Sequence, residues 1–193
     1  GCVCDVISVL VDFVEVFPNW LPYVDFRTMY AARQVLGCGV ILSQIHEIDY
    51  LYWLFGKPTS LLASGGKMSN LEIDVEDTAN IILGFGKRSG DQIIATLNMD
   101  FIRHDTTRQC LVIGKKGSLR WNGTVGEVQY FPEDGKGWEV LYSSMPERDY
   151  TYVEEIRHFF SSIESGNSPL ISGESGLEAV LAIEAINESS NVG

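Results

Sequence analysis

The sequence is short of basic residues: Lys and Arg number 14 against 26 Asp and Glu, and the formal net charge is −12. Nucleic acids and anionic membrane surfaces are bound through patches of positive charge, which this composition does not favour. We therefore expect neither kind of partner. With 45% hydrophobic and 21% charged residues over 193 positions, the composition is typical of one globular domain with its own core.

Cysteine is also scarce, and the four that occur are Cys2, Cys4, Cys38 and Cys110. They form no Cys-x-x-Cys pair and show no metal-ligand spacing, so they indicate neither a disulfide scaffold nor a zinc site. A reducing, cytoplasmic setting is the expectation for such a chain. His46-Glu47 begins like a metalloprotease motif, but Tyr50 stands where the second histidine is needed. We therefore expect no metal.

Membrane-spanning and nucleotide-binding segments are missing too. The apolar run from Val6 to Val16 is interrupted by Asp12 and Glu15, and no basic residue precedes it, so it is neither a membrane span nor a signal peptide. The glycines from Gly84 to Gly90 lie between two strand-like segments, which indicates a hairpin. A dinucleotide loop requires a strand, then the glycines, then a helix. We therefore expect no cofactor-binding residues in this chain.

The most strongly patterned stretch of the sequence is a helical segment bounded by glycines, Gly37 to Gly56. Its apolar positions recur with a helical period and are Ile41, Ile45, Ile48, Tyr52 and Phe55. Polar residues at spacings of three and four share one face, and they are Ser43, His46, Asp49 and Tyr50. We expect one largely buried helix. A polar stripe on a buried helix must find hydrogen-bond partners or face a cavity, which makes this stripe the best functional clue.

The rest of the chain predicts a sheet. Period-two alternation predicts strands at 6–16, 60–66, 79–85, 93–101, 111–113, 119–121, 127–131 and 138–142. Short turns such as Asn122-Gly123 join most of them, which predicts antiparallel pairing. Two further helices are predicted at 152–165 and 177–190. We expect a single α+β domain over residues 1–193, a mostly antiparallel sheet that is open on one face and carries helices on the other.

His46 is the centre of the candidate site. A lone histidine on an apolar helix is most often a packed residue with one hydrogen bond. A histidine with a carboxylate at Asp49, beside Tyr50 and Ser43, is better placed for acid–base work. The residue pattern alone leaves both interpretations open.

Two weaker groups of polar residues accompany it. Arg27, Tyr30 and Arg33 recur at intervals of three before the main helix, which fits either a short solvated helix or a polar hook over a pocket. The strand from Ile94 to Ile102 presents a polar strip that continues to Arg103. This strip is either the solvent face of a half-buried sheet or the floor of a polar pocket or a dimer surface.

Seven stretches, in this order, resemble a known family: Asn19-Trp20-Leu21-Pro22-Tyr23, Tyr30-Ala31-Ala32-Arg33, Gly37-Cys38-Gly39, His46-Glu47-Ile48-Asp49-Tyr50-Leu51-Tyr52-Trp53-Leu54-Phe55-Gly56, Glu76-Asp77-Thr78-Ala79, Gly114-Lys115-Lys116-Gly117-Ser118-Leu119-Arg120-Trp121 and Tyr152-Val153-Glu154-Glu155-Ile156. They are similar to the C-terminal substrate domain of the Gfo/Idh/MocA family (glucose–fructose oxidoreductase, inositol dehydrogenase). The resemblance implies a Rossmann domain outside this chain that holds NAD or NADP. Because the first residue is Gly1, we expect a segment to be missing upstream.

The same resemblance implies roles for individual residues. The histidine matching His46 acts as acid–base on the hydroxyl of a sugar or polyol, and Asp49 matches an aspartate beside it. The chain departs from the pattern at Ser43, where the family has an acid, and at Cys38, where it has glycine. Arg27, Tyr30, Arg33 and Arg103 become candidates for binding substrate.

The expected function is the catalytic substrate domain of an NAD(P)-dependent sugar or polyol oxidoreductase, which the resemblance implies is a homodimer through its open sheet face. The alternative is a non-catalytic sugar-binding or dimerisation module, which the missing acid at Ser43 favours.

Overall fold

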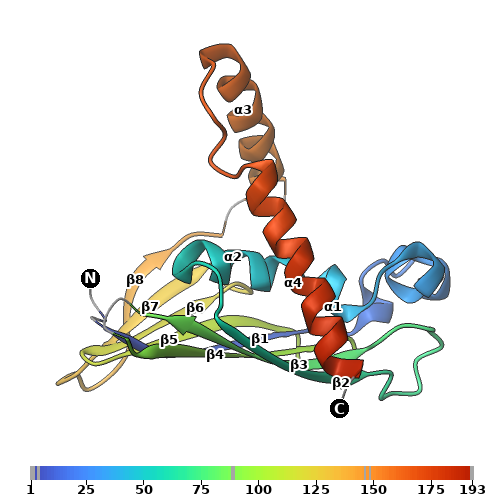
Figure 1. Cartoon of the computed structure of the whole chain (residues 1–193), viewed down its shortest axis with the longest axis horizontal. Helices are drawn as coiled ribbons and strands as arrows, with labels where there is room; N and C mark the ends of the chain where they lie inside the picture. Colours follow the sequence, from blue (N-terminus) through green and yellow to red (C-terminus); the bar gives the residue numbers. More distant parts are fainter. Residues whose placement is uncertain (1–2, 4, 88–89, 146, 148, 192–193) are drawn as a thin grey trace.

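Eight strands form one sheet in the order β2-β3-β4-β1-β5-β6-β7-β8 (Figure 1). The computed structural model describes residue 3 and residues 5–87, 90–145, 147 and 149–191. The strands are β1 (Val6–Val14), β2 (Ser60–Gly66), β3 (Thr78–Gly86), β4 (Gln92–Asp100), β5 (Thr107–Gly114), β6 (Gly117–Asn122), β7 (Glu127–Pro132) and β8 (Glu139–Ser143). All eight predicted strands are confirmed. Arg88 and Ser89 of the predicted 84–90 hairpin lie outside the described residues.

Strand β1 lies in the middle of the sheet, although it comes first in the chain. It pairs in parallel with β4 and antiparallel with β5, while every other pair of neighbouring strands is antiparallel. β1 therefore joins the hairpin series β2-β3-β4 to the series β5-β6-β7-β8. Val9 and Val11 point from β1 into the core, as the alternation predicts.

Helices cover one face of this sheet. They are α1 (Val40–Ser43), α2 (His46–Phe55), α3 (Tyr150–Ser165) and α4 (Gly173–Asn191). α1 and α2 lie along the sheet, and the C-terminal half of α4 packs on β2 and α2 (Figure 1). The core between these layers contains Ile48 and Leu51 of α2 against Leu83 and Leu97 of the sheet. Among the described residues no helix covers the other face, so the predicted α+β fold with one open face is confirmed.

The prediction of one continuous helix from residue 37 to 56 is wrong. α1 ends at Ser43, a turn follows at Gln44 and Ile45, and α2 begins at His46. The amides of Ile45 and Glu47 bond to carbonyls three residues back instead of four, which tightens the backbone at this point. His46 is therefore the first residue of a helix and not a residue in the middle of one.

The segment before α1 is not a helix of normal length either. It consists of four short 3₁₀ turns at Phe17–Asn19, Phe26–Thr28, Tyr30–Ala32 and Gln34–Leu36. Asp25 caps the second turn because its side chain accepts a hydrogen bond from the Arg27 amide. The last turn ends at Gly37, whose φ of 79° is easy only for glycine.

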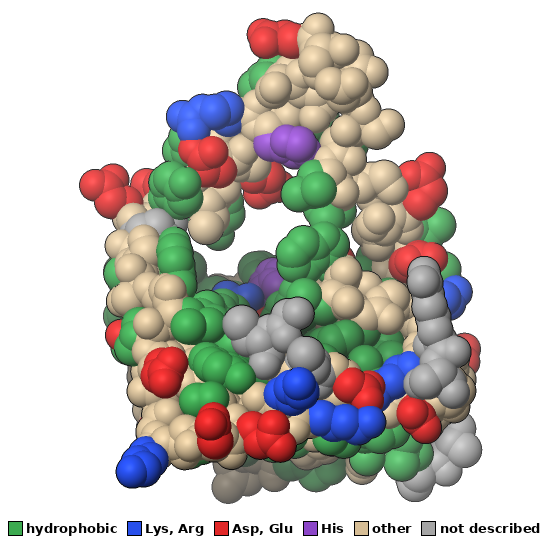
Figure 2. Space-filling model, turned by 90° about the vertical axis from the view of Figure 1, so that its left-hand side faces the viewer, with side chains coloured by type: hydrophobic (Ala, Val, Ile, Leu, Met, Phe, Trp, Pro, Cys, Tyr) green, Lys and Arg blue, Asp and Glu red, His purple; other side chains and the backbone are tan. Residues whose placement is uncertain are grey.

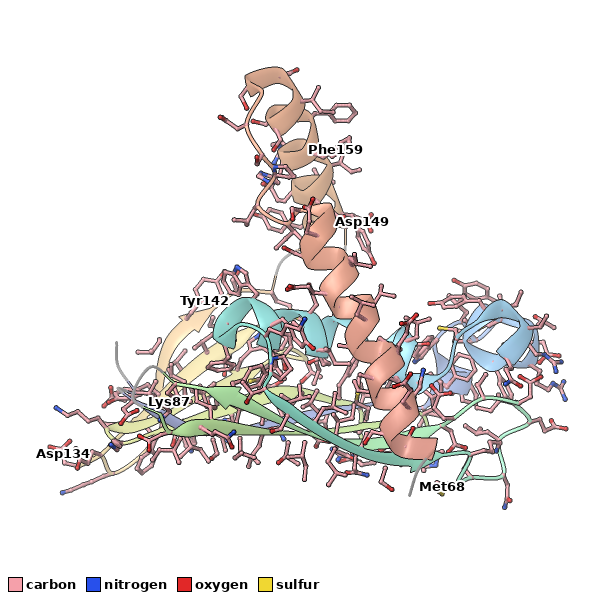
Figure 3. All side chains as sticks on the ribbon, viewed as in Figure 1. Met68, Lys87, Asp134, Tyr142, Asp149 and Phe159 are labelled. Carbon is pink, nitrogen blue, oxygen red and sulfur yellow. The ribbon has the colours of Figure 1, made fainter. Side chains whose placement is uncertain are left out.

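Helix α3 has the predicted apolar stripe but does not pack it on the sheet. Its members are Val153, Ile156, Phe159, Phe160 and Ile163, and each is between 49% and 62% exposed. Figures 1 and 3 show α3 standing away from the sheet, with Phe159 far from the core. The first turns of α4 lie near the base of α3, and the helix then descends toward the sheet (Figure 1).

Candidate active site

The break between α1 and α2 positions the three predicted catalytic residues. Ser43 ends α1, His46 begins α2 and Asp49 lies one turn further along α2. All three lie on the helix-bearing side of the sheet, but only Asp49 acts on His46, because the Ser43 hydroxyl is directed at Cys38. Figure 2 shows that the molecule is deeply hollowed between the standing helices and the sheet, and that a histidine lies beside a basic side chain inside the hollow.

The surroundings of His46 favour its neutral form. Partial burial lowers the pKa of His46, the Arg108 guanidinium lowers it further, and the Asp49 carboxylate opposes both effects. A neutral imidazole can accept a proton. Within the described part of the chain the His46 side chain makes no hydrogen bond, so its ring nitrogens are free to meet a ligand.

A second polar stripe lies beneath His46, on the face of the helices that packs on the sheet. It consists of Gln44, Glu47 and Tyr50 at intervals of three. Gln44 and Glu47 are fully buried. Both amide atoms of Gln44 have no hydrogen-bond partner among the described residues. The Tyr50 hydroxyl lies close enough to Glu47 and Cys110 to interact with both side chains. Buried polar atoms without partners are unusual in a core, so the Gln44 amide is a place where a water molecule or a ligand group could bind.

Glu47 is held by an ion pair that crosses from helix to sheet. Arg108 of β5 donates from Nε at 2.8 Å, and its Nη2 lies 2.7 Å from the same carboxylate oxygen. Burial raises the pKa of Glu47, and the Arg108 cation opposes that rise. Burial likewise raises the pKa of Tyr50, and it raises the pKa of the Cys110 thiol to about 11.

Aromatic rings fix Arg108 from the sheet side. Its guanidinium carbon lies 4.8 Å from the ring centre of Phe13 and 5.3 Å from that of Trp121. Tyr50 of α2 meets the same Trp121 edge-on at 5.8 Å. Cation–ring contacts of this kind stabilise a partly desolvated arginine. Arg108 is thus a fixed positive charge, 33% exposed, directly under the start of α2.

Ser43 does not contact His46 through a hydrogen bond. Its Oγ lies 3.1 Å from Cys38 Sγ. The two departures from the family pattern are therefore neighbours in space.

Glycine at position 39 is required by the start of α1. The Glu76 backbone carbonyl accepts from the Val40 amide at 3.0 Å, and Glu76 Oε1 accepts from the Ile41 amide at 3.2 Å. A methyl group at Gly39 would overlap the Glu76 carboxylate. Glu76 therefore caps the helix that leads into the site.

Two of the predicted substrate-binding residues, Arg27 and Arg33, are engaged in ion pairs within the chain. Arg27 is tied to Asp25 and Glu72 by ion pairs. Arg33 donates to the carbonyl of Arg27 and pairs with Asp74. These contacts fasten the 3₁₀ segment to the loop at 72–74, so both arginines have structural partners.

Tyr30 and Arg103 lie on different sides of the sheet. Tyr30 is exposed, and partial desolvation, together with Cys38 and Tyr152, raises the pKa of its hydroxyl. Arg103 bonds to Asp12 at 2.9 Å. Asp12 alternates along β1 with residues that face the helices, so it points to the open face. Arg103 therefore lies on the opposite side of the sheet from His46.

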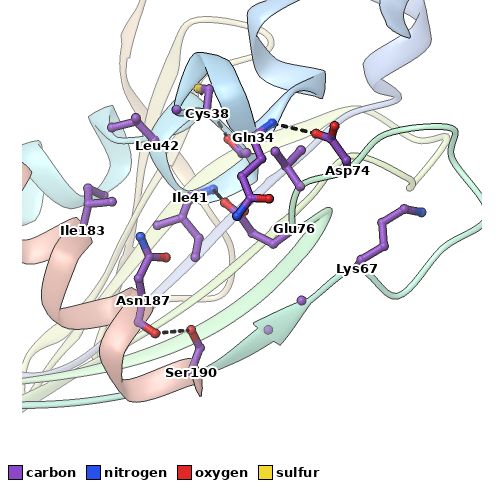
Figure 4. A pocket seen from close by; sticks show the side chains of 15 residues that line it. Gln34, Cys38, Ile41, Leu42, Lys67, Asp74, Glu76, Ile183, Asn187 and Ser190 are labelled. Carbon is purple, nitrogen blue, oxygen red and sulfur yellow. Dashed lines mark hydrogen bonds between the residues drawn. The ribbon is translucent and has the colours of Figure 1, made fainter. Parts of the chain in front are cut away.

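A polar pocket of about 460 Å³ lies beside α1, between the Gly37–Gly39 entry, the end of β2 and the end of α4. Figure 4 shows Glu76 bonded to the Ile41 amide and Asp74 bonded to the Gln34 amide at its walls. His46 does not line this pocket. Its residues adjoin the site through Cys38.

Among the described residues we find neither the strand–glycine loop–helix arrangement of a dinucleotide site nor a cluster of metal ligands. The glycines at 84 and 86 end a strand of a hairpin, and the N-terminus of α1, where a pyrophosphate could bind, is already occupied by Glu76. Across the described ranges, no cluster of His, Cys, Asp and Glu side chains could hold a metal ion.

Among the helices that are described, none has the length and apolarity to cross a membrane.

Sequence reasoning missed Glu47 and Arg108. A signal for Glu47 was present, since a charged residue flanked at intervals of three by Gln44 and Tyr50 interrupts the apolar helix. No local signal marks Arg108, which lies 61 positions away.

A family model described as "Oxidoreductase family, C-terminal alpha/beta domain" (GFO_IDH_MocA_C) matches residues 15–193. The chain belongs to this family. The resemblance inferred from the motifs is therefore confirmed, and the open-faced sheet is the family's C-terminal domain.

Relatives and solved structures of the family agree with this assignment. The chain is 27% identical over 154 residues to inositol 2-dehydrogenase 2 of Paenarthrobacter aurescens, covering 76% of this chain and 44% of the relative. It is 29% identical over 160 residues to myo-inositol 2-dehydrogenase of Thermotoga maritima, covering 78% and 46%. The chain thus spans about half the length of the curated relatives it matches. A levoglucosan dehydrogenase in complex with NADH superposes with a TM-score of 0.81 at 19% identity, covering 99% of this chain and 58% of that one.

Proposed function

We propose that this Gfo/Idh/MocA domain is the catalytic substrate domain of an NAD- or NADP-dependent oxidoreductase that acts on a sugar or polyol. The observation that carries the proposal is the position of His46 at the first turn of α2, where partial desolvation and the Arg108 guanidinium lower its pKa and its side chain makes no hydrogen bond within the described part of the chain. The curated relatives, both inositol dehydrogenases by name, support a polyhydroxylated substrate.

His46 is the acid–base group in this proposal. In the oxidising direction its neutral imidazole accepts the proton of a substrate hydroxyl, and in the reducing direction it returns that proton. Asp49 acts on the ring electrostatically from one turn away and favours the protonated form once it has formed. Ser43 assists only indirectly, because its hydroxyl is engaged with Cys38.

Tyr30 is the substrate-binding candidate that we retain from the initial four, because its side chain is exposed on the same side of the sheet as Cys38. The ion pairs of Arg27 and Arg33 occupy much of their donor capacity. Arg103 lies on the open face and is left out of the site.

The nicotinamide cofactor is assigned to a separate dinucleotide-binding domain. Glu76 already caps the start of α1, and no strand–glycine loop–helix unit that could hold a pyrophosphate is found in the described part of this chain. The exposed apolar stripe of α3 is suited to packing against such a domain. We therefore expect this chain alone to bind NAD or NADP more weakly than about 1 μM by calorimetry, which is about −8 kcal/mol.

A homodimer through the open face is also part of the proposal. Leu62, Ile82, Thr96, Leu10 and Leu111 lie opposite one another in register across five adjacent strands. This row continues beside an apolar depression of about 900 Å³ next to α4. A second copy of the chain would remove this surface from water.

The free thiols of Cys38 and Cys110 support a reducing, cytoplasmic setting.

The second candidate function is a non-catalytic sugar-binding or dimerisation module. The contact between Ser43 and Cys38 favours it. At the position where we expect the family to have an acid, this chain has a hydroxyl that points to Cys38 and not to His46.

One experiment separates the two functions. The chain, joined to its dinucleotide-binding domain, is assayed for NADH or NADPH formation with inositols, aldoses and anhydrosugars. The proposal expects turnover of at least one of these substrates. Saturable sugar binding without turnover across the panel would favour the module.

A further inference from the structure

The polar pocket beside α1 takes no part in the acid–base scheme above, and four separate segments of the chain build it. Its volume of about 460 Å³ lies in the range of sites for small molecules. The buried side chains of Ile41, Val75 and Ile183 form an apolar base, while the exposed Gln34 and Asn187 lie at the opening. Such a pocket offers apolar contact to a ligand's carbon atoms and polar contact to its functional groups.

The wall formed by the loop after β2 has a fixed shape. The Asp77 carboxylate accepts hydrogen bonds from the Met68 amide at 2.8 Å and from the Ser69 amide at 3.0 Å. The Asp77 amide donates to the Gly66 carbonyl at 3.1 Å, and the side chain of Asp77 is fully buried. The neighbouring Glu76 is therefore held at a defined place in the pocket wall.

The charges on this wall have partners within the chain, except for the charge of Glu76. Lys67 contacts Asp77 at 3.3 Å, and Asp74 contacts Arg33 at 3.6 Å. None of the ion pairs found among the described residues involves Glu76. Its Oε1 accepts from a backbone amide of α1 at 3.2 Å, and its Oε2 makes no hydrogen bond within the described part of the chain. One carboxylate oxygen of the pocket is thus left for a ligand.

A half-buried carboxylate without a cation is costly. Burial raises the pKa of Glu76, its hydrogen bonds to backbone amides lower that pKa, and the Asp77 charge raises it. A positive charge brought in by a ligand would offset this cost. Two further acceptors lie nearby, because the side-chain amides of Gln34 and Asn187 make no hydrogen bond among the described residues, and Figure 4 shows both around the same pocket as Glu76.

We propose that this pocket binds a small polar amine, such as an amino sugar, through its ammonium group. An ammonium has three N–H donors, which Glu76 Oε2 and the amide oxygens of Gln34 and Asn187 can accept. The apolar base then contacts the C–H groups of the ring. An anionic ligand is disfavoured, because Glu76 would repel it. The site is separate from His46 and does not depend on the proposed dehydrogenase function.

The test compares two sugars that differ in one group. Glucosamine and glucose are titrated by calorimetry into the chain joined to its dinucleotide-binding domain, without cofactor, at about pH 6, where the amine is protonated. Glucosamine should bind with a Kd below about 1 mM and at least about tenfold more tightly than glucose. N-acetylglucosamine, in which the charge is removed, should bind as weakly as glucose.

Two variants locate the site. Glu76→Gln removes the charge but keeps an oxygen for the α1 amide, and it should weaken glucosamine binding at least about tenfold. Asn187→Leu obstructs the opening from an exposed position of α4, so it should fold normally and weaken binding by a similar factor. Glu184→Leu is the matched control, because it is exposed one turn earlier on α4 and does not line the pocket. It should bind glucosamine like the wild type.

Three results would overturn the inference: no glucosamine binding at about 10 mM, binding no tighter than that of glucose, or binding that neither Glu76→Gln nor Asn187→Leu weakens. The titrations require no turnover. Their failure is therefore distinguishable from failure of the proposed dehydrogenase activity, which the substrate panel tests.

Discussion

Cys38 Sγ lies 3.1 Å from Ser43 Oγ, so the two positions where the sequence led us to expect a departure from the family's pattern contact each other. Cys38 is buried beside the glycine entry to α1, and it takes up space that a glycine would leave open. A carboxylate at position 43 needs more room than a hydroxyl. The two departures are therefore one local change in the structure of the site.

This contact predicts how the acid can be restored. Ser43→Asp alone should crowd Cys38 and lower the melting temperature, whereas Cys38→Gly with Ser43→Asp should fold normally. If His46 is catalytic, the double variant should raise kcat roughly tenfold or shift its optimum to higher pH, because a new carboxylate stabilises the imidazolium. Cys38→Gly alone is the control. A well-folded double variant with unchanged kcat and pH optimum would contradict this account of the departures.

Glu76 predicts a stability effect at Gly39. Gly39→Ala should displace the carboxylate that caps α1 and cost about 1 kcal/mol of unfolding free energy, the usual loss for a helix cap. Chemical denaturation measures it. Gly137→Ala is a matched control, since an added methyl group there meets no other atom within 4 Å. Equal stability of the two variants would show that the cap contributes little.

The open face predicts the oligomeric state. Leu10 lies between Thr96 and Leu111 in the row across this face, and Leu10→Lys should convert a dimer to a monomer at micromolar concentration, because a buried lysine is costly at an interface. Light scattering reports the mass. Leu170→Lys changes a residue that is 73% exposed away from this face and should leave the dimer intact. A wild-type chain that stays monomeric would count against the proposed interface.

The lowered pKa of His46 predicts a pH dependence with a defined sign. In the unfolded chain His46 titrates near about 6.5, and in the folded chain it binds its proton less readily. Stability is therefore unaffected above that pH and decreases as the pH falls through it toward the folded pKa. His46→Asn should remove this part of the decrease. Unfolding curves between pH 5 and 7, at intervals of about half a unit, measure the effect, and identical slopes for both proteins would contradict it.

Local periodicity was enough to predict every strand, because the alternation of Ala79, Ile81, Leu83 and Phe85 is a property of neighbouring residues. The break at Gln44 and the position of β1 between β4 and β5 depend on contacts between distant parts of the chain. Sequence patterns do not record such contacts.

The candidate site shows the same division. The polar residues of one helix were visible from their spacing, so His46 and Asp49 could be named from the sequence. The pairing of Glu47 with Arg108 depends on strand register, which fixes which residue of β5 lies under α2. Arg103 was placed with the site because it follows a polar strip, but that strip belongs to the open face. The apolar stripe of α3 could be predicted from the spacing of its residues. That the stripe is exposed could not, because exposure depends on how α3 sits relative to the sheet.

The most direct test of the central proposal is the turnover of His46→Asn in the chain joined to its dinucleotide-binding domain. If His46 is the acid–base group, kcat should fall by roughly 10²- to 10⁴-fold while the melting temperature stays nearly constant. His104→Asn, an exposed histidine after β4, should leave kcat unchanged. Turnover of His46→Asn within about threefold of wild type, a far smaller loss than general acid–base catalysis supplies, together with a lower melting temperature, would show that His46 is a packed structural residue.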